Sequence, residues 1–227
     1  MIFTDIKSNQ YISPSGRNGE YMKVLLINGS PREKGCTYTA LMEAVSVFEK
    51  NGVETELVWV GNQPVAGCTA CGACGKTGKC IFDDKVNEII EKFDEYDGVI
   101  VGSPVYYAGV SGQITSFLDR LFYAGGRKVK GKPAATIVSC RRGGASAAFE
   151  IINKYFMMTN MPVVTSQYWN QVHGNTPEEV KQDLEGLQTV RVLAQNMTWL
   201  LRCIEAGKAA GVEYPEYEPK QRTNFIR

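Results

Sequence analysis

The sequence has a single histidine, His173, among its 227 residues. Histidine-rich catalytic zinc sites use two or three such ligands, so one histidine argues against this class of site. A hydrolase built on a Ser-His-Asp triad would depend on this one base, and the G-x-S-x-G turn that presents the serine in many hydrolases is missing. The sequence therefore disfavours both kinds of hydrolytic centre.

The sequence also lacks an excess of charge and a long apolar run. Lys and Arg total 25 against 24 for Asp and Glu, which leaves no broad field to attract nucleic acid or an anionic membrane. No stretch of about 18 apolar residues occurs, and the first residues lack the cationic start and apolar run of a signal peptide. We expect a cytoplasmic protein without a nucleic-acid or membrane partner.

What is present is a regular alternation of short β-branched runs with helical patterns, which is typical of an α/β fold with a parallel sheet. The predicted strands are Lys23–Asn28, Glu54–Val60, Gly98–Val105, Pro133–Cys140 and Pro162–Gln167. The predicted helices are Thr37–Lys50, Lys85–Glu95, Gly112–Phe122 and Ser146–Met158, followed by one long helix that Thr176 caps and that reaches Ile204. We expect a polar arm over residues 1–21, one domain over 22–207 and a tail over 208–227.

The first predicted strand runs into a loop, Asn28 to Thr37, that opens the first helix. Such a turn offers unpaired backbone N–H groups and the positive end of a helix dipole, which favours a phosphate. Ser30 and Thr37 can add hydroxyl donors and Arg32 a charged fork. The loop lacks the G-x-G-x-x-G spacing, which disfavours a dinucleotide-binding Rossmann domain.

Four motifs in order carry a family resemblance: KVLLINGSPREKGCT, the Cys-rich stretch ending KCIFDD, VGSPVYYAGVSGQITSFLDRLF and SCRRGG. Together they resemble the NADPH-dependent FMN reductase and iron–sulfur flavoprotein family. The resemblance implies a flavodoxin-like, doubly wound, five-stranded parallel sheet of order 2-1-3-4-5. It also implies a non-covalent FMN at the carboxyl ends of the strands and assembly as homodimers or homotetramers.

Carried over position by position, the resemblance assigns three loops to FMN. The phosphate would bind Ser30, Arg32, Cys36 and Thr37, in the first loop. The isoalloxazine ring would lie against Pro104, Val105, Tyr106, Tyr107 and Gly109, in the loop after the third strand. The pyrimidine edge would meet Ser139, Arg141, Arg142, Gly143 and Gly144, where positive charge or N–H groups stabilise a reduced flavin.

Four of the seven cysteines, Cys68, Cys71, Cys74 and Cys80, crowd into a Gly-rich loop over residues 67–82. Four thiolates are what a [4Fe–4S] cluster requires, and the spacing resembles the compact motif of iron–sulfur flavoproteins. A structural zinc and reduced thiols kept for packing or redox work are the alternatives. Cys36, Cys140 and Cys203 are expected to be small buried groups.

The primary functional expectation is an oxidoreductase in which NAD(P)H reduces FMN and the reduced flavin serves a quinone, another flavin or an electron-poor aromatic. The flavin carries the chemistry, so no catalytic side chain is required. The alternative is an electron carrier that has a [4Fe–4S] cluster beside FMN and accepts electrons from ferredoxin. A flavin-binding regulatory protein without turnover is a third possibility.

Overall fold

The structure is a computed structural model, and it describes residues 22–225. The predicted arm over residues 1–21 lies outside the described residues. Within the described part of the chain, no helix is both long enough and apolar enough to cross a membrane.

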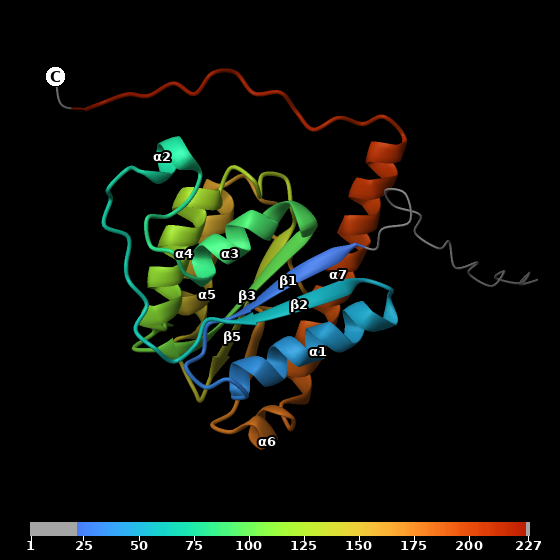
Figure 1. The fold of residues 1–227 in the computed structure, drawn as a ribbon. Coiled ribbons are helices and arrows are strands. Elements are labelled where there is room, and N and C mark those ends of the chain that lie inside the picture. The colour runs from blue at the N-terminus through green and yellow to red at the C-terminus, as the bar shows by residue number, and fades with distance from the viewer. Residues whose placement is uncertain (1–21, 226–227) are drawn as a thin grey trace, which may run out of the picture.

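One parallel sheet forms the centre of the molecule (Figure 1). Its strands lie in the order β2-β1-β3-β5-β6, which confirms the predicted 2-1-3-4-5 order because β4 is off this path. The strands are β1 (Lys23–Asn28), β2 (Glu54–Trp59), β3 (Gly98–Tyr106), β4 (Gly109–Val110), β5 (Ala134–Cys140) and β6 (Gln171–His173). The short β4 pairs antiparallel with the end of β3, an element that the sequence did not predict.

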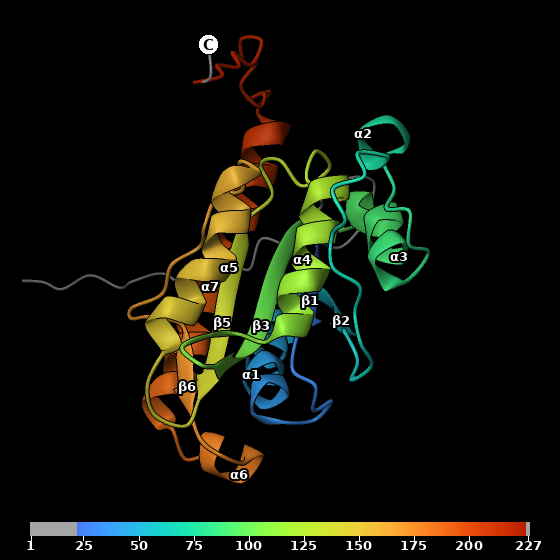
Figure 2. The same ribbon diagram turned by 90° about the vertical axis from the view of Figure 1, so that its left-hand side faces the viewer.

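Helices cover both faces of the sheet, and alternate residues of the strands face opposite sides. Val24 and Leu26 join the core under α1 (Cys36–Lys50) and α7 (Leu184–Ala209). Leu25 and Ile27 join the core of the other face. That face is covered by α3 (Lys85–Lys92) with the 3-10 turn η2 (Phe93–Glu95), by α4 (Gly112–Gly125) and by α5 (Ala145–Met158), as Figure 2 shows.

The predicted fifth strand at Pro162–Gln167 is wrong. This segment makes a single bridge, between Val163 and Ala134, and the fifth parallel strand is Gln171–His173. The side chain of Asn196, on α7, donates to the carbonyl of Thr165 at 2.8 Å, so a helix contacts the backbone of this segment. A tertiary contact overrides the apolar, β-branched composition of this stretch.

The long C-terminal helix was predicted as one element, and the structure divides it in two. Thr176 does cap the first turn, accepting from the N–H of Glu179 at 3.3 Å, but α6 spans only Pro177–Val180. Asp183 then caps α7, accepting from the N–H of Gly186 at 2.9 Å and from that of His173 at 2.6 Å. Because Asp183 serves both α7 and the edge strand β6, the helix must begin again there.

Candidate functional site

The three loops predicted to bind FMN meet at the carboxyl ends of β1, β3 and β5. The hydroxyls of Thr37 and Ser139 lie 2.8 Å apart, which joins the first turn of α1 to the end of β5. Ser111, which caps α4, donates to the carbonyl of Gly29 at 2.8 Å and joins the first loop to α4. A Cβ on Gly144 would lie 2.8 Å from the Cα of Ala108, so the third and fourth loops are in contact. The structure thus brings the three loops together at one edge of the sheet.

The loop between β1 and α1 is held by its own hydrogen bonds. The side chain of Asn28 accepts from the N–H of Ser30 at 3.1 Å and donates to the carbonyl of Glu33 at 2.9 Å. The Ser30 hydroxyl accepts from the N–H of Arg32 at 3.1 Å, and the Trp59 indole donates to the Ser30 carbonyl at 2.8 Å. Ser30 is buried and Arg32 is exposed. The loop is therefore fixed while its guanidinium is free to reach a ligand.

Two helix N-termini at these loops have no side-chain cap. Among the described helices longer than two turns, α3, α4 and α7 are capped by Asp84, Ser111 and Asp183, whereas α1 and α5 are not capped by a side chain. The first amide groups of a helix have no partner within the helix, and the helix dipole makes them attractive to an anion. Both uncapped ends therefore fit an anionic ligand, in agreement with the donor chemistry that FMN requires.

The segment predicted as a loop after β3 is a tight hairpin. Tyr106 pairs with Gly109, and the two residues between them, Tyr107 and Ala108, have φ of 50° and 58°. This is the turn geometry that favours glycine or asparagine, so two other residues there carry strain of the order of 1–3 kcal/mol each. Tyr107 is fully exposed at this turn. Strained backbone of this kind clusters at active sites and ligand-binding loops.

The loop after β5 exposes Arg141, Arg142 and Gly143, whereas Ser139, near the end of β5, is buried. Cys140 is also buried, and burial raises the pKa of its thiol. Burial likewise raises the pKa of the Cys36 thiol, which donates to the carbonyl of Gly174 at 3.6 Å. Both thiols are therefore protonated at neutral pH and act as weak donors.

All four cysteines of the Cys-rich loop line one cavity, together with residues of α4. The loop follows α4: the side chain of Gln113 donates to the carbonyl of Gln63 at 2.8 Å, and Arg120 donates to that of Ala66 at 3.4 Å. Figures 1 and 2 both place the one-turn helix α2 (Cys74–Thr77) beside the far end of α4.

The path of this loop depends on left-handed backbone at three residues, Ala70 (φ 54°), Gly72 (φ 72°) and Gly78 (φ 70°). A Cβ on either glycine would meet open space, so glycine is needed there for conformation and not for room. These turns allow the cysteines, separated by up to eleven intervening residues, to line the same cavity.

The cavity offers an all-sulfur donor set, which fits an iron–sulfur cluster by its chemistry. The fit is one of donor chemistry and not of distance, because among residues 22–225 no three His, Cys, Asp or Glu side chains are close enough to hold a metal ion. Cys68 and Cys71 are exposed, and Cys74 and Cys80 are half-buried. The expectation that the remaining cysteines are buried holds for Cys140, whereas Cys36 is half-buried and Cys203 is exposed on α7.

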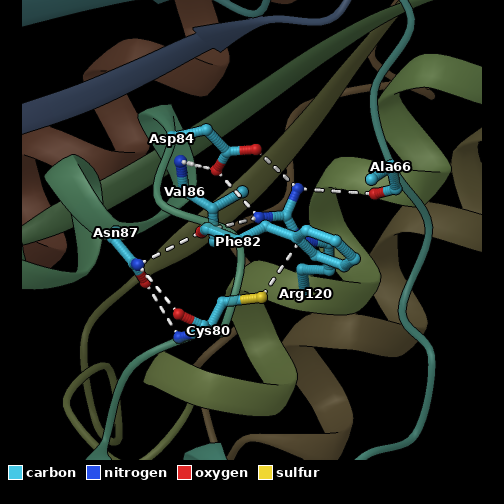
Figure 3. Close-up of polar contacts among 7 residues, drawn as sticks. All are labelled: Ala66, Cys80, Phe82, Asp84, Val86, Asn87 and Arg120. Atoms are coloured by element: carbon cyan, nitrogen blue, oxygen red, sulfur yellow. Dashed lines mark hydrogen bonds and ion pairs between the residues drawn. The ribbon is translucent and has the colours of Figure 1, made fainter.

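Sequence reasoning missed the residues that anchor this loop. Arg120 on α4 binds Asp84, Cys80 and backbone carbonyls of the loop, and Asn87 on α3 binds the backbone around Cys80 (Figure 3). A signal was available, because Arg120 follows the buried Phe117 by three residues on the apolar side of its helix. A charged residue buried at such a position needs a partner.

Comparison with known proteins agrees with the geometry. The family model described as NADPH-dependent FMN reductase matches residues 22–176. An iron–sulfur flavoprotein of Methanocaldococcus jannaschii is 34% identical over 194 residues, covering 81% of this chain and 100% of its own length. An iron–sulfur flavoprotein of Methanosarcina thermophila is 31% identical over 192 residues, covering 82% of this chain and 99% of its own length.

Solved structures confirm the flavodoxin-like fold. RosB with a bound 8-demethyl-8-formylriboflavin-5'-phosphate superimposes with a TM-score of 0.63 at 18% identity, covering 91% of this chain and 92% of that one. A flavodoxin from the domain Archaea gives 0.55 at 15% identity, covering 80% and 99%. The chain belongs to the NADPH-dependent FMN reductase family of flavin oxidoreductases, in which its curated relatives include iron–sulfur flavoproteins.

Proposed function

We propose that the protein is an iron–sulfur flavoprotein that transfers electrons between a protein donor, such as ferredoxin, and an acceptor through FMN and a [4Fe–4S] cluster. The observation that carries the proposal is the single cavity lined by Cys68, Cys71, Cys74 and Cys80. The relatives described above as iron–sulfur flavoproteins support it. We therefore prefer an electron carrier to an NAD(P)H-dependent reductase as the function of this protein.

In this proposal the first loop holds the FMN phosphate. The amide groups that open α1 and the hydroxyls of Ser30 and Thr37 donate to it, and the exposed Arg32 adds a charge-assisted contact. Cys36, at the start of α1, contributes its backbone N–H, since its protonated thiol already donates to Gly174. The phosphate is therefore bound mainly by groups that are in place beforehand.

The hairpin and the loop after β5 would hold the ring. The hairpin contributes Pro104, Val105, Tyr106, Tyr107 and Gly109. The end of β5 and the loop after it contribute Ser139, Arg141, Arg142, Gly143 and Gly144. Bound FMN supplies the redox chemistry and accepts one or two electrons. The arginines and the uncapped start of α5 stabilise negative charge on the ring, which makes reduction more favourable.

The cysteine cavity would hold the cluster, which supplies one-electron transfer when bound. One helix links the two sites: Ser111 caps α4 beside the flavin loops, and Arg120 lies nine residues later under the cysteine loop. Nine residues of helix correspond to about 14 Å along its axis. A rigid element thus sets the spacing between the two regions of the chain.

The test is anaerobic purification followed by absorption spectroscopy and by iron and sulfide analysis. We expect FMN and about four iron atoms per chain, the stoichiometry of a [4Fe–4S] cluster. Absence of iron after anaerobic reconstitution would contradict the cluster and leave zinc or free thiols. Reduced ferredoxin should reduce the flavin faster than NADPH does.

A second candidate is the NAD(P)H-dependent reduction of an acceptor by FMN alone, which the description of the matching family favours. Rapid oxidation of NADH or NADPH with quinones by iron-free protein would support it.

We further propose a homodimer or homotetramer, because large apolar side chains are exposed at Tyr123, Met157, Met158 and Trp199. Light scattering at several protein concentrations tests the number of subunits.

A further inference from the structure

Arg120 is buried completely and every N–H of its guanidinium has an acceptor. Its Nε donates to the sulfur of Cys80 at 3.2 Å, and its two terminal nitrogens donate to the carboxylate of Asp84 at 2.7 and 2.8 Å. The same nitrogens reach the carbonyls of Ala66 at 3.4 Å and Phe82 at 3.2 Å. Five donors thus meet five acceptors, all from the segment that contains the cysteines (Figure 3).

The backbone of Cys80 is fixed as firmly as its sulfur. The N–H of Cys80 donates to the side-chain oxygen of Asn87 at 2.8 Å, and the amide nitrogen of Asn87 donates to the carbonyls of Cys80 at 2.9 Å and Phe82 at 3.2 Å. Among the described residues, Cys80 is the one member of the four cysteines whose sulfur accepts a hydrogen bond. Cys80 is therefore the ligand held in place by its surroundings.

We propose that Arg120 is the positioning residue for the cluster ligand Cys80 and that it raises the reduction potential of a cluster bound by the four cysteines. This inference rests on the proposed function. Reduction adds negative charge to the cluster and its sulfur ligands, and an N–H donor with a fixed positive charge stabilises the reduced form more than the oxidised form.

Arg120 keeps its positive charge, and water screens that charge only weakly. A guanidinium stays protonated in proteins, and that of Arg120 is paired with the carboxylate of Asp84. The Arg120 side chain is 0% exposed, whereas that of Asp84 is 42% exposed. Water therefore screens the carboxylate more than the guanidinium, and a net positive influence on Cys80 remains.

The experiment is a spectroscopic redox titration of anaerobically purified, cluster-loaded protein, with iron analysis of each variant. In Arg120→Gln we expect the oxidised-to-reduced ratio at a fixed potential to rise about tenfold, which is a fall of about 59 mV for a one-electron couple. Arg120→Lys should give a smaller fall, because it retains the charge but not the Nε donor. Arg191→Gln, which breaks a half-buried ion pair with Glu43 away from the cysteine loop, is the matched control and should leave the potential unchanged.

Asp84→Asn provides a test that keeps Arg120. Removing the carboxylate leaves the guanidinium charge uncompensated, so the potential should rise, while asparagine can still cap α3. Iron-replete Arg120→Gln with the wild-type potential would overturn the inference, as would Asp84→Asn with an unchanged or lower potential if Arg120→Gln does not fold. Wild-type protein that binds no iron would instead refute the proposed function.

Discussion

The candidate flavin loops and the cysteine loop are built in opposite ways. The candidate flavin loops present exposed side chains from fixed backbone, and buried hydroxyls such as those of Thr37 and Ser139 contact one another beneath them. The cysteine loop consists largely of exposed residues turned by left-handed backbone, and Arg120 and Asn87 fix it chiefly around Cys80. A phosphate site can be complete before its ligand arrives, whereas a cluster site gains much of its order from the metal.

Removal of one of the four cysteines proposed as cluster ligands should have the largest effect on one site and little effect on the other. In Cys71→Ser we expect loss of most of the iron with FMN retained, because the two sites use separate residues. Iron analysis and flavin absorbance of the same sample measure both. Cys203→Ser, an exposed cysteine on α7, is the control and should keep its iron. Loss of FMN along with the iron would mean that the two sites are interdependent.

Removing the support of Cys80 tests whether one part of the cysteine loop is preorganised. Asn87→Ala should lower the free energy of unfolding of iron-free protein by about 2–4 kcal/mol, because it leaves buried polar groups around Cys80 without partners. Urea denaturation followed by circular dichroism measures the change. Glu88→Ala, at the exposed neighbouring position, should change it little. Equal stability of both variants would mean that Asn87 does not order the loop.

In the candidate flavin loops, removal of a single hydroxyl tests the proposed phosphate site. Thr37→Val keeps the shape of the side chain but removes its donor, and FMN affinity should fall about tenfold, or about 1.4 kcal/mol. Fluorescence titration of apoprotein with FMN gives the dissociation constant. Thr39→Val, in which a hydroxyl bonded to the carbonyl of Gly35 is removed, is the control and should bind FMN normally. Unchanged affinity in Thr37→Val would contradict the assigned loop.

The smallest effect concerns the strained hairpin. Ala108→Gly should raise the free energy of unfolding by about 1 kcal/mol, because glycine accepts the φ of 58° without steric cost. Thermal unfolding of the apoprotein measures it. Ala147→Gly, on the exposed side of α5, should instead destabilise the protein. A less stable Ala108→Gly would mean that the methyl group packs usefully at the turn.

The sequence predicted the inner part of the sheet well because local pattern and burial agree there. Lys23–Asn28 is bounded as expected, since both of its faces are covered by helices. The edge strand was misplaced because local composition does not reveal tertiary contacts such as that of Asn196, on the later helix α7, with the carbonyl of Thr165. Arg120 was missed for the same reason: its partners lie 36 to 54 residues away in the chain.

The family motifs identified the candidate flavin loops, and the structure adds how the loops touch. The Cys spacing indicated a shared ligand, but it did not distinguish Cys80 from the other three cysteines. That distinction depends on Arg120 and Asn87, which reach Cys80 from two different helices. Spacing along a chain carries no information about such neighbours.

Because α4 begins beside the candidate flavin loops and passes under the cysteine loop, the number of residues between Ser111 and Arg120 is constrained. One inserted residue before Arg120 would rotate the rest of the helix by about 100° and advance it by 1.5 Å, carrying the guanidinium away from Cys80. The strand-to-helix connection over residues 60–84 has only short turns of its own and can absorb extra residues at small entropic cost. Natural variants of this protein should therefore differ in length within that connection and never within the helix beneath it.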